Sequence, residues 1–383
     1  MMHIIYCIPS LYNSGGMERV LTVKANYMAE HFGWNISIIT TCQKGRPPFY
    51  NISEKIKLYD LDLDYETIHE ARMIRKISLR HQARKKHFKR LSNLLFKLHP
   101  DIVVSMFTHE ATFLYKIKDG SKKVLEFHFS KKYRTLDTLY NNRSLAKTII
   151  DFFLNWRDSH LPQKYDKFVV LTHEDAKAWG EIKSMFVIYN PITLHRSSIQ
   201  TVEKCHQILA VGRLCPQKGF DLLINSWALI PASDRQDWSI KIIGSGPDQE
   251  KLQRQIESMN LSDSISIVPP TSHIENEYAK SEIFCFSSRY EGIGLVLIEA
   301  LGSGLPAISF DCPCGPSEII DNNRTGFIVP MGNITLFAEY ITKLISSDCL
   351  RKDMGRNAEK RINEKFKLER IMSQWKDLFE SLL

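Results

Sequence analysis

The sequence predicts an α/β protein built from two doubly wound domains, each with a parallel sheet. Its 383 residues are enough for two domains of ordinary size. Short apolar runs alternate with longer helical patterns in the first half, and the second half repeats this scheme. Such alternation is typical of parallel sheets with helices on both faces. The composition, 43% hydrophobic and 25% charged, excludes a disordered or collagen-like chain.

The elements follow in order along the chain. Strands are predicted in the apolar runs at 3–11, 35–41, 55–63, 101–108, 122–130, 167–173, 185–192, 206–214, 239–247, 264–270, 282–288, 306–312 and 326–330. Helices are predicted at 18–31, 222–229, 249–259 and in a segment ending near 301. From residue 334 onward the pattern is helical only, so these helices must pack on structure that is already formed.

A domain boundary is predicted where turn residues and polar residues cluster between Pro191 and Lys204. The predicted domains are residues 1–195 and 196–365. Residues 366–383 are expected to form a helix that crosses back and packs on the first domain, an inference from the order of the elements alone.

The N-terminal sequence, the apolar runs and the cysteines indicate the cellular compartment of the protein. No apolar run approaches the ~18 residues of a spanning helix, and the N-terminus lacks a basic leader with a cleavage site. We therefore expect a cytoplasmic chain. The eight cysteines are scattered, which favours reduced thiols. Cys312 and Cys314 form a C-x-C pair without a second ligand pair, so no metal site is expected.

One strongly basic segment stands out at residues 71–97. It has ten basic residues and no acidic one, whereas the net charge of the whole chain is +8. Apolar residues recur there at steps of three and four, which predicts an amphipathic helix or helix pair with a cationic face. Such a face either keeps the protein soluble or binds an anionic partner.

Glycine-containing loops after predicted strands are candidate phosphate sites, because backbone amides approach phosphate oxygens there. Gly15 and Gly16 follow the first strand and open a helix, although they do not form a G-x-G-x-x-G motif. Arg213 and Lys218 follow the first strand of the second half and could neutralise a diphosphate. Gly244 lies in a further loop of this type.

The clearest signal is the segment 287–300, where a strand ends, a glycine loop follows and an apolar helix begins. Glu291 stands before that helix and Glu299 inside it. A buried, unpaired Glu299 would cost several kcal/mol, so it needs a partner, and ligand hydroxyls could serve. A helical rise of ~1.5 Å per residue puts the two carboxylates about 10 Å apart. The backbone from Gly292 through Gly294 to Leu295 would face the phosphates of the same ligand.

These patterns, with FDCPCGPSEII at 310–320, resemble glycosyltransferase family 4. Members are retaining transferases with the two-domain GT-B fold, and the match covers essentially the whole chain. The segment at 310–320 looks most like that of enzymes that build bacterial surface polysaccharide, namely capsule, O-antigen or exopolysaccharide, from UDP-hexoses or UDP-N-acetylhexosamines.

The resemblance implies roles for individual residues. Arg213 and Lys218 would bind the donor diphosphate, Glu299 the ribose hydroxyls, and Glu291 the donor sugar near its reacting carbon. The family often places a histidine close to that sugar, and here either His128 or His109 fills the position.

The resemblance also implies the partners. They are a UDP-sugar and a glycan acceptor linked to a polyprenyl diphosphate, at the inner face of the cell membrane, with no cofactor and no metal. The cationic segment would hold the anionic membrane surface and the acceptor through Arg72, Arg84, Lys85, Lys86 and Lys89. A UDP-sugar epimerase or hydrolase of the same fold is the alternative. A nucleic-acid-binding protein would explain the basic segment but not the paired glutamates.

One further pattern is a decoy. The D-x-D sequence at 60–64 occurs in metal-dependent transferases of another fold, but here it ends a predicted strand. A solvent-facing alternation is the favoured interpretation.

Overall fold

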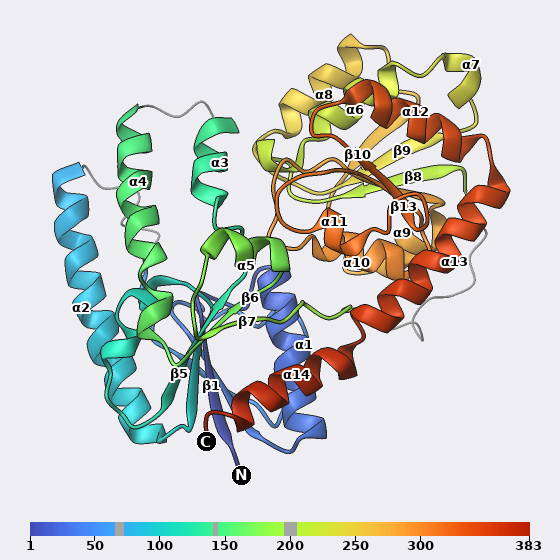
Figure 1. The fold of residues 1–383 in the computed structure, drawn as a ribbon. Helices are drawn as coiled ribbons and strands as arrows, with labels where there is room; N and C mark the ends of the chain where they lie inside the picture. The colour runs from blue at the N-terminus through green and yellow to red at the C-terminus, as the bar shows by residue number, and fades with distance from the viewer. Residues whose placement is uncertain (66–72, 141–144, 195–204) are drawn as a thin grey trace.

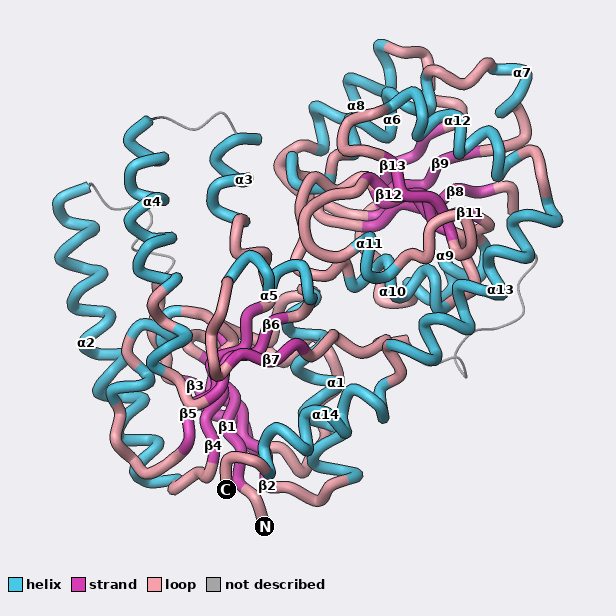
Figure 2. The backbone as a smooth tube through the Cα atoms, viewed as in Figure 1, coloured by secondary structure: helices cyan, strands magenta, loops and turns pink. Residues whose placement is uncertain are grey.

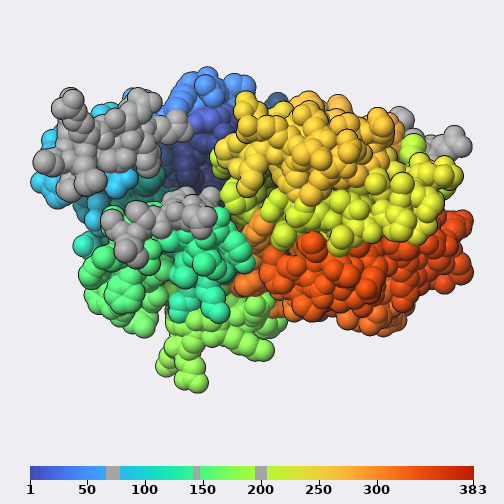
Figure 3. Space-filling model, turned by 90° about the horizontal axis from the view of Figure 1, so that it is seen from above, coloured from blue at the N-terminus to red at the C-terminus, as the bar shows by residue number. Residues whose placement is uncertain are grey.

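A computed structural model describes residues 1–65, 73–140, 145–194 and 205–383. Its two α/β domains stand side by side, as two lobes in the space-filling view (Figure 3) and as two separate sheets in the backbone trace (Figure 2). Arg72 and the predicted boundary between 195 and 196 lie outside the described residues.

The first domain has, within the described residues, a seven-stranded parallel sheet of order β3-β2-β1-β4-β5-β6-β7. Its strands are β1 (His3–Ile8), β2 (Asn35–Thr40), β3 (Lys57–Asp60), β4 (Ile102–Ser105), β5 (Lys122–Phe127), β6 (Lys167–Val170) and β7 (Met185–Val187). Its α-helices are α1 (Gly16–His31), α2 (Met73–Leu98), α3 (Tyr133–Tyr140), α4 (Leu145–Ser159) and α5 (His173–Trp179). Short 3₁₀ turns are η2 (His109–Thr112), η3 (Leu114–Lys116) and η4 (Pro162–Lys164).

The second domain has, over the described part of the chain, a six-stranded parallel sheet of order β10-β9-β8-β11-β12-β13. Its strands are β8 (Gln207–Val211), β9 (Ser239–Ile243), β10 (Ile265–Val268), β11 (Ile283–Phe286), β12 (Ala307–Phe310) and β13 (Gly326–Val329). Its helices are η6 (Pro216–Lys218), α6 (Phe220–Ala228), α7 (Ala232–Arg235), α8 (Gln249–Ser258), α9 (Ile274–Lys280), α10 (Leu295–Gly302), α11 (Pro316–Ile319), α12 (Ile334–Ile345) and α13 (Asp348–Lys365).

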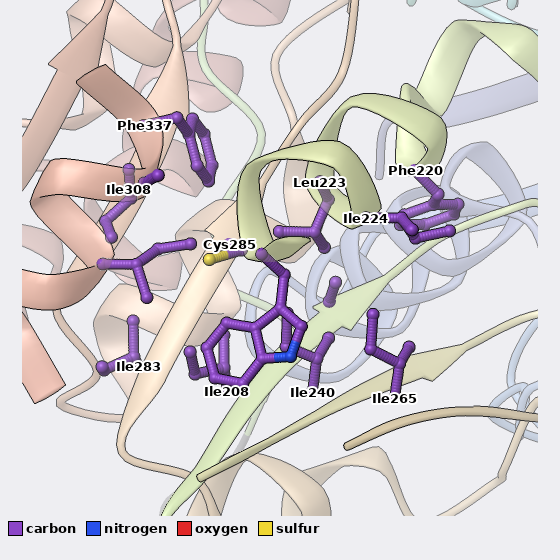
Figure 4. Close-up of a cluster of buried hydrophobic side chains, with 14 of the residues drawn as sticks. Ile208, Phe220, Leu223, Ile224, Ile240, Ile265, Ile283, Cys285, Ile308 and Phe337 are labelled. Carbon is purple, nitrogen blue, oxygen red and sulfur yellow. The ribbon is translucent and has the colours of Figure 1, made fainter. Parts of the chain in front are cut away.

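Each predicted strand run contains one of these strands, so the predicted fold class is confirmed. The strands are short and rich in Ile, Val and Phe because both faces of a parallel sheet are covered by helices. In the second domain Ile208, Ile240 and Ile265 on three neighbouring strands pack beneath Leu223 and Ile224 of α6 (Figure 4). From residue 73 onward, the basic segment forms the single helix α2 rather than a helix pair.

The chain passes between the domains twice. The segment after β7 enters the second domain, and the amide of Ile192 there donates a hydrogen bond to the carbonyl oxygen of Phe366 at 2.9 Å. Phe366 follows α13, and the final helix α14 (Leu368–Glu380) then lies on the first domain (Figure 1). Met372 and Trp375 of α14 are buried in the same cluster as Ile4 of β1. The predicted crossing-back of the C-terminal helix is therefore confirmed.

Candidate active site

The two domains meet at loops that follow strand ends. Gly15 precedes α1 and Gly16 is its first residue. A side chain at Gly16 would lie 3.8 Å from Cδ2 of Leu295, which is the first residue of α10. The amino ends of these two helices therefore lie close together, and amino ends of helices favour anionic groups.

A second close approach joins the glycine loop before α10 to the end of β5. A Cβ atom at Gly292 would stand 2.2 Å from the carbonyl oxygen of His128, so only glycine fits there. His109 lies elsewhere in the first domain, where it opens η2 and its ring stacks on Tyr65 with centroids 4.0 Å apart. Of the two candidate histidines, the structure brings His128 to the domain junction.

The ring of His128 lies beside a buried ion pair. Its Nε2 lies 3.0 Å from Oε1 of Glu126, which is also 2.5 Å from Nζ of Lys24. Burial alone would raise the pKa of Glu126, but Lys24 and His128 lower it to about 2. Lys24 in turn lies 3.7 Å from the ring centroid of Trp375 on α14. The C-terminal helix α14 therefore packs against Lys24, the cation of the buried Lys24–Glu126 ion pair beside His128.

Lys218 and Glu291 form an ion pair at the carboxyl ends of β8 and β11. Nζ of Lys218 is 2.6 Å from Oε1 of Glu291, and Oγ of Ser288 donates to the same oxygen at 2.6 Å. Glu291 is only 8% exposed. The loop thus places one cation and one carboxylate in direct contact beside Gly292.

Arg213 stands two residues beyond the end of β8 with its side chain exposed. Over the described residues, no hydrogen bond or ion pair holds its guanidinium. The loop beside it is close-packed, because a Cβ atom at Gly244 would lie 1.9 Å from the carbonyl oxygen of Gly212. Arg213 is therefore an available cation on a rigid loop.

Glu299 lies inside α10 and is 1% exposed. Its Oε1 is 2.9 Å from Nη1 of Arg19 and accepts a hydrogen bond from Thr193 at 2.5 Å. Its Oε2 accepts one from Tyr278 at 3.1 Å. Burial raises the pKa of Glu299, and Arg19 opposes that shift. In this structure protein groups satisfy Glu299, and its contact with ligand hydroxyls stays a prediction.

The helical extrapolation does not apply to the spacing of the two carboxylates. Gly294 caps α10, so the backbone between Glu291 and the helix is a loop and not a continuation of the helix. The rise of an α-helix therefore does not set the separation of Glu291 and Glu299.

The segment at 310–320 is built into the domain junction. Glu318 accepts hydrogen bonds from the amides of His173 and Glu174 at 3.1 and 2.7 Å and from the hydroxyl of Tyr189 at 2.8 Å. In the other direction, the amide of Cys314 donates to Oε2 of Glu174 at 2.8 Å. Each domain thus contributes a carboxylate that binds backbone amides of the other.

Comparison with known proteins shows what this chain is similar to. Residues 192–361 match the family described as glycosyl transferases group 1. The chain is 28% identical to an uncharacterized glycosyltransferase of Haemophilus influenzae, over 99% of this chain and all of that protein. It is 27% identical to the amylovoran biosynthesis glycosyltransferase AmsD of Erwinia amylovora, over 99% of both. A crystal structure of Staphylococcus aureus TarM in complex with UDP superposes with a TM-score of 0.79 at 17% identity, covering 99% of this chain and 100% of that one.

The chain is a glycosyltransferase with the GT-B fold. Its relatives include a protein of exopolysaccharide synthesis, and the comparisons do not favour the alternative of an epimerase or hydrolase. The residues at the domain junction are therefore the candidate active site of this glycosyltransferase.

The cationic residues of α2 lie away from that site. Arg84, Lys85, Lys86 and Lys89 are all exposed, and Arg84 donates to the carbonyl oxygen of Thr112 at 3.1 Å. In Figures 1 and 3, α2 occupies the side of the first domain that faces away from the second. These cations cannot share a small ligand with Arg213.

The remaining sequence patterns have structural roles. Cys312 and Cys314 are buried free thiols. Leu61 and Leu63 point into the first-domain core while Asp62 is exposed, so the D-x-D segment alternates as predicted. Through the described ranges, no three side chains of His, Cys, Asp or Glu gather into a group that could hold a metal. Likewise, no described helix has both the length and the apolar character needed to cross a bilayer.

Several site residues were not singled out from the sequence. Arg19, Thr193 and Tyr278 satisfy Glu299 from three distant segments, a contact that no local pattern reveals. Lys24 and Glu126 did leave a signal, because each is a charged residue with an apolar residue on both sides in the sequence. Such a residue needs a buried partner.

Proposed function

We propose that this glycosyltransferase is a metal-independent, retaining member of family 4 that transfers a hexose or N-acetylhexosamine from a UDP-sugar. The proposed acceptor is a glycan on a polyprenyl diphosphate at the inner face of the cell membrane. The product is a bacterial surface polysaccharide: capsule, O-antigen or exopolysaccharide. The observation that carries the proposal is the Lys218–Glu291 pair together with the nearby Arg213, which has no hydrogen bond or ion pair among the described residues.

Two cations at one strand end suit a leaving diphosphate. UDP gains negative charge as the glycosidic bond breaks, and preorganised cations stabilise that charge in the transition state. Arg213 is available without breaking any hydrogen bond or ion pair to the part of the chain that the structure describes, and Lys218 needs only to turn from Glu291 toward the phosphate. The amides at the start of α10 and the glycines of the α1 loop add further donors. These groups provide the stabilisation that a metal ion would otherwise supply.

Glu291 and His128 are proposed to contact the donor sugar. An oxocarbenium-like sugar is stabilised by electron-rich neighbours, and Glu291 with the diphosphate oxygens provides them. The backbone of His128 lies against the same loop at Gly292, and its Nε2 is 3.0 Å from a carboxylate oxygen of Glu126. We assign His128, rather than His109, to the sugar site on this placement.

Glu299 is proposed to bind the ribose hydroxyls once Arg19 moves away. Oε2 of Glu299 accepts one hydrogen bond from Tyr278, and a carboxylate oxygen can accept a second. Arg19 belongs to the first domain, so its ion pair with Glu299 forms only while the domains are close. Release of Arg19 would expose the carboxylate to the donor.

The relatives and the surface charge support the acceptor class. AmsD is named for amylovoran biosynthesis, and TarM was crystallised with UDP. The exposed cations of α2 suit the headgroups of an anionic membrane, where a lipid-linked acceptor resides. We assign no nucleic-acid partner.

The proposal is tested by a thermal-stabilisation screen of UDP, GDP, ADP and a panel of nucleotide-sugars, with EDTA present. A ligand at 100 times its dissociation constant adds about 2.7 kcal/mol to the free energy of unfolding. We expect UDP and one UDP-sugar to raise the melting temperature of the wild type but not of Arg213→Ala. Stabilisation by GDP or ADP alone, or by UDP equally in both proteins, would refute the donor assignment.

A further inference from the structure

Helix α4 of the first domain presents an apolar face to solvent. Five of its large hydrophobic side chains are between 54 and 67% exposed, whereas Leu154 is half-buried. We call these five the α4 crest: Ile149, Ile150, Phe152, Phe153 and Trp156. At 3.6 residues per turn, all but Ile150 fall within an arc of about 100° on one side of the helix.

The opposite side of α4 is polar and buried. Asp151 is 4% exposed, with its carboxylate 3.0 Å from Nζ of Lys147 and 2.5 Å from Oγ1 of Thr138. Asp158 is 6% exposed and is 2.6 Å from Nη2 of Arg134. The helix is therefore inverted relative to an ordinary surface helix, whose apolar face packs on the core.

An inverted helix needs a partner, because contiguous exposed apolar surface marks an interaction site. The neighbouring helix α2 indicates which partner. Figures 1 and 3 place α2 and α4 beside each other at the same end of the first domain. The sequence of α2 contains no acidic residue, and Lys85, Lys86 and Lys89 on it are exposed.

Charge complementarity selects an anionic bilayer over a second copy of the chain. A symmetric dimer through the α4 crest would bring two cationic α2 helices to the same interface, where like charges repel. A bilayer with anionic lipids attracts the cations of α2 and accepts apolar side chains at once. Trp156 is an amphipathic aromatic residue of the kind that favours the membrane interface.

We propose that the α4 crest inserts into the interfacial layer of an anionic bilayer while the cations of α2 bind its headgroups. Helix α4 has 15 residues, fewer than the ~20 that span a bilayer, so it would lie in the interface rather than cross it. This inference deepens the proposed function by naming the membrane-contacting element. It rests on the proposed function in one respect, namely that the acceptor of the enzyme lies at a membrane.

The experiment is co-sedimentation with vesicles of phosphatidylcholine alone or with phosphatidylglycerol. The crest variant replaces Phe152, Phe153 and Trp156 by Ser. We expect wild type to sediment with the anionic vesicles and the crest variant to lose about tenfold or more of its partitioning. A matched control replaces three exposed apolar residues elsewhere, Leu58, Leu229 and Met259, by Ser, and should sediment like wild type.

The cations are tested separately. A variant with Arg84, Lys85, Lys86 and Lys89 replaced by Gln should lose the salt-sensitive part of binding, since exposed charges are screened within ~8 Å at physiological ionic strength. In wild type, brominated phosphatidylglycerol should quench tryptophan emission, and Trp156→Phe should abolish most of that quenching. The quadruple Gln variant and Trp156→Phe should both keep the melting temperature of wild type, and UDP should stabilise both as it stabilises wild type.

Two results would overturn the inference. The first is that the crest variant sediments with anionic vesicles as well as wild type does. The other is a wild-type dimer in analytical ultracentrifugation that the crest variant converts to monomer while neither protein binds vesicles, which would assign the crest to a second copy. If crest-dependent sedimentation is present but no UDP compound stabilises the wild type, the proposed donor fails while the membrane inference stands.

Discussion

Arg19 of the first domain and Glu299 of the second form an ion pair across the domain junction, with Nη1 and Oε1 2.9 Å apart. Arg19 lies in α1 directly after the glycine loop, and Glu299 lies in the helix that the second glycine loop opens. The carboxylate proposed to hold the donor is thus closed off by a cation of the opposite domain. Under the proposed function, the donor and Arg19 therefore bind the same carboxylate group.

This pair allows a matched comparison of two variants. Glu299→Gln should weaken UDP binding about tenfold or more, because ribose hydroxyls lose a charged acceptor. Arg19→Gln removes the same ion pair but keeps the carboxylate, so it should bind UDP as well as wild type or better. Titration calorimetry with UDP measures both. Equal losses in the two variants would mean that the ion pair, and not ribose binding, is what Glu299 provides.

Replacing either proposed diphosphate cation should slow turnover. Arg213→Ala or Lys218→Ala should lower kcat by about a hundredfold or more, the range for losing one charge-stabilising donor. Arg213 makes the cleaner test, because it is exposed and its loss leaves no buried group without a partner. Melting temperatures should stay near wild type for Arg213→Ala. Wild-type turnover in both variants would remove these cations from the mechanism.

Glu291→Gln should mainly lower kcat with little change in UDP affinity, because its carboxylate acts on the sugar in the transition state. Ser288→Ala serves as the control. It removes one hydrogen bond to Oε1 of Glu291 and leaves the carboxylate and Lys218 in place. Its kcat should fall far less. If the two variants lose equal activity, Glu291 serves to position the loop rather than to contact the sugar.

The buried group behind His128 should control stability. Lys24→Met leaves Glu126 buried without its cation and should cost about 3 to 5 kcal/mol of unfolding free energy. The double variant Lys24→Met with Glu126→Leu should recover most of that loss yet remain poorly active, because His128 has then lost its carboxylate. Urea unfolding and initial rates measure the two effects. Full activity in the double variant would contradict the positioning role of Glu126.

The same carboxylate predicts a pH dependence. The folded-state pKa of Glu126 is about 2, below its ordinary value of 4.5. Its contribution to stability is therefore present above about pH 4.5 and is lost as the pH falls toward 2. Urea unfolding at pH values from 6 to 2 should show that the free energy of unfolding falls less in the double variant Lys24→Met with Glu126→Leu than in wild type. An identical pH profile for the two proteins would argue against the pair.

The sequence predicted the fold well because parallel strands buried on both faces leave continuous apolar runs. Each such run, from Ile4 in β1 to Val329 in β13, became a strand. The candidate site was predicted only where a local pattern marks it, as at Lys218, Glu291 and the glycine at 292. The partners of Glu299 come from α1, α9 and the crossing segment, and pairings across so many intervening residues depend on the tertiary fold.

The inverted pattern of α4 shows a further limit of sequence reasoning. Its apolar residues recur with helical spacing, which ordinarily predicts a face packed on the core. Periodicity identifies an apolar face but not the direction in which it points. The buried carboxylates of Asp151 and Asp158 set that direction, and their partners Thr138 and Arg134 lie on another helix.

The transfer proposed for this enzyme is retaining and metal-independent, from a UDP-sugar to an acceptor. The most direct test incubates the enzyme with the UDP-sugar that stabilises it, a lipid-linked glycan acceptor and EDTA, and determines the anomeric configuration of the new linkage by proton NMR. We predict a product with the configuration of the donor, and no release of free sugar or epimer when the acceptor is omitted. An inverted linkage, a need for added metal, or free sugar formed without acceptor would contradict the claim.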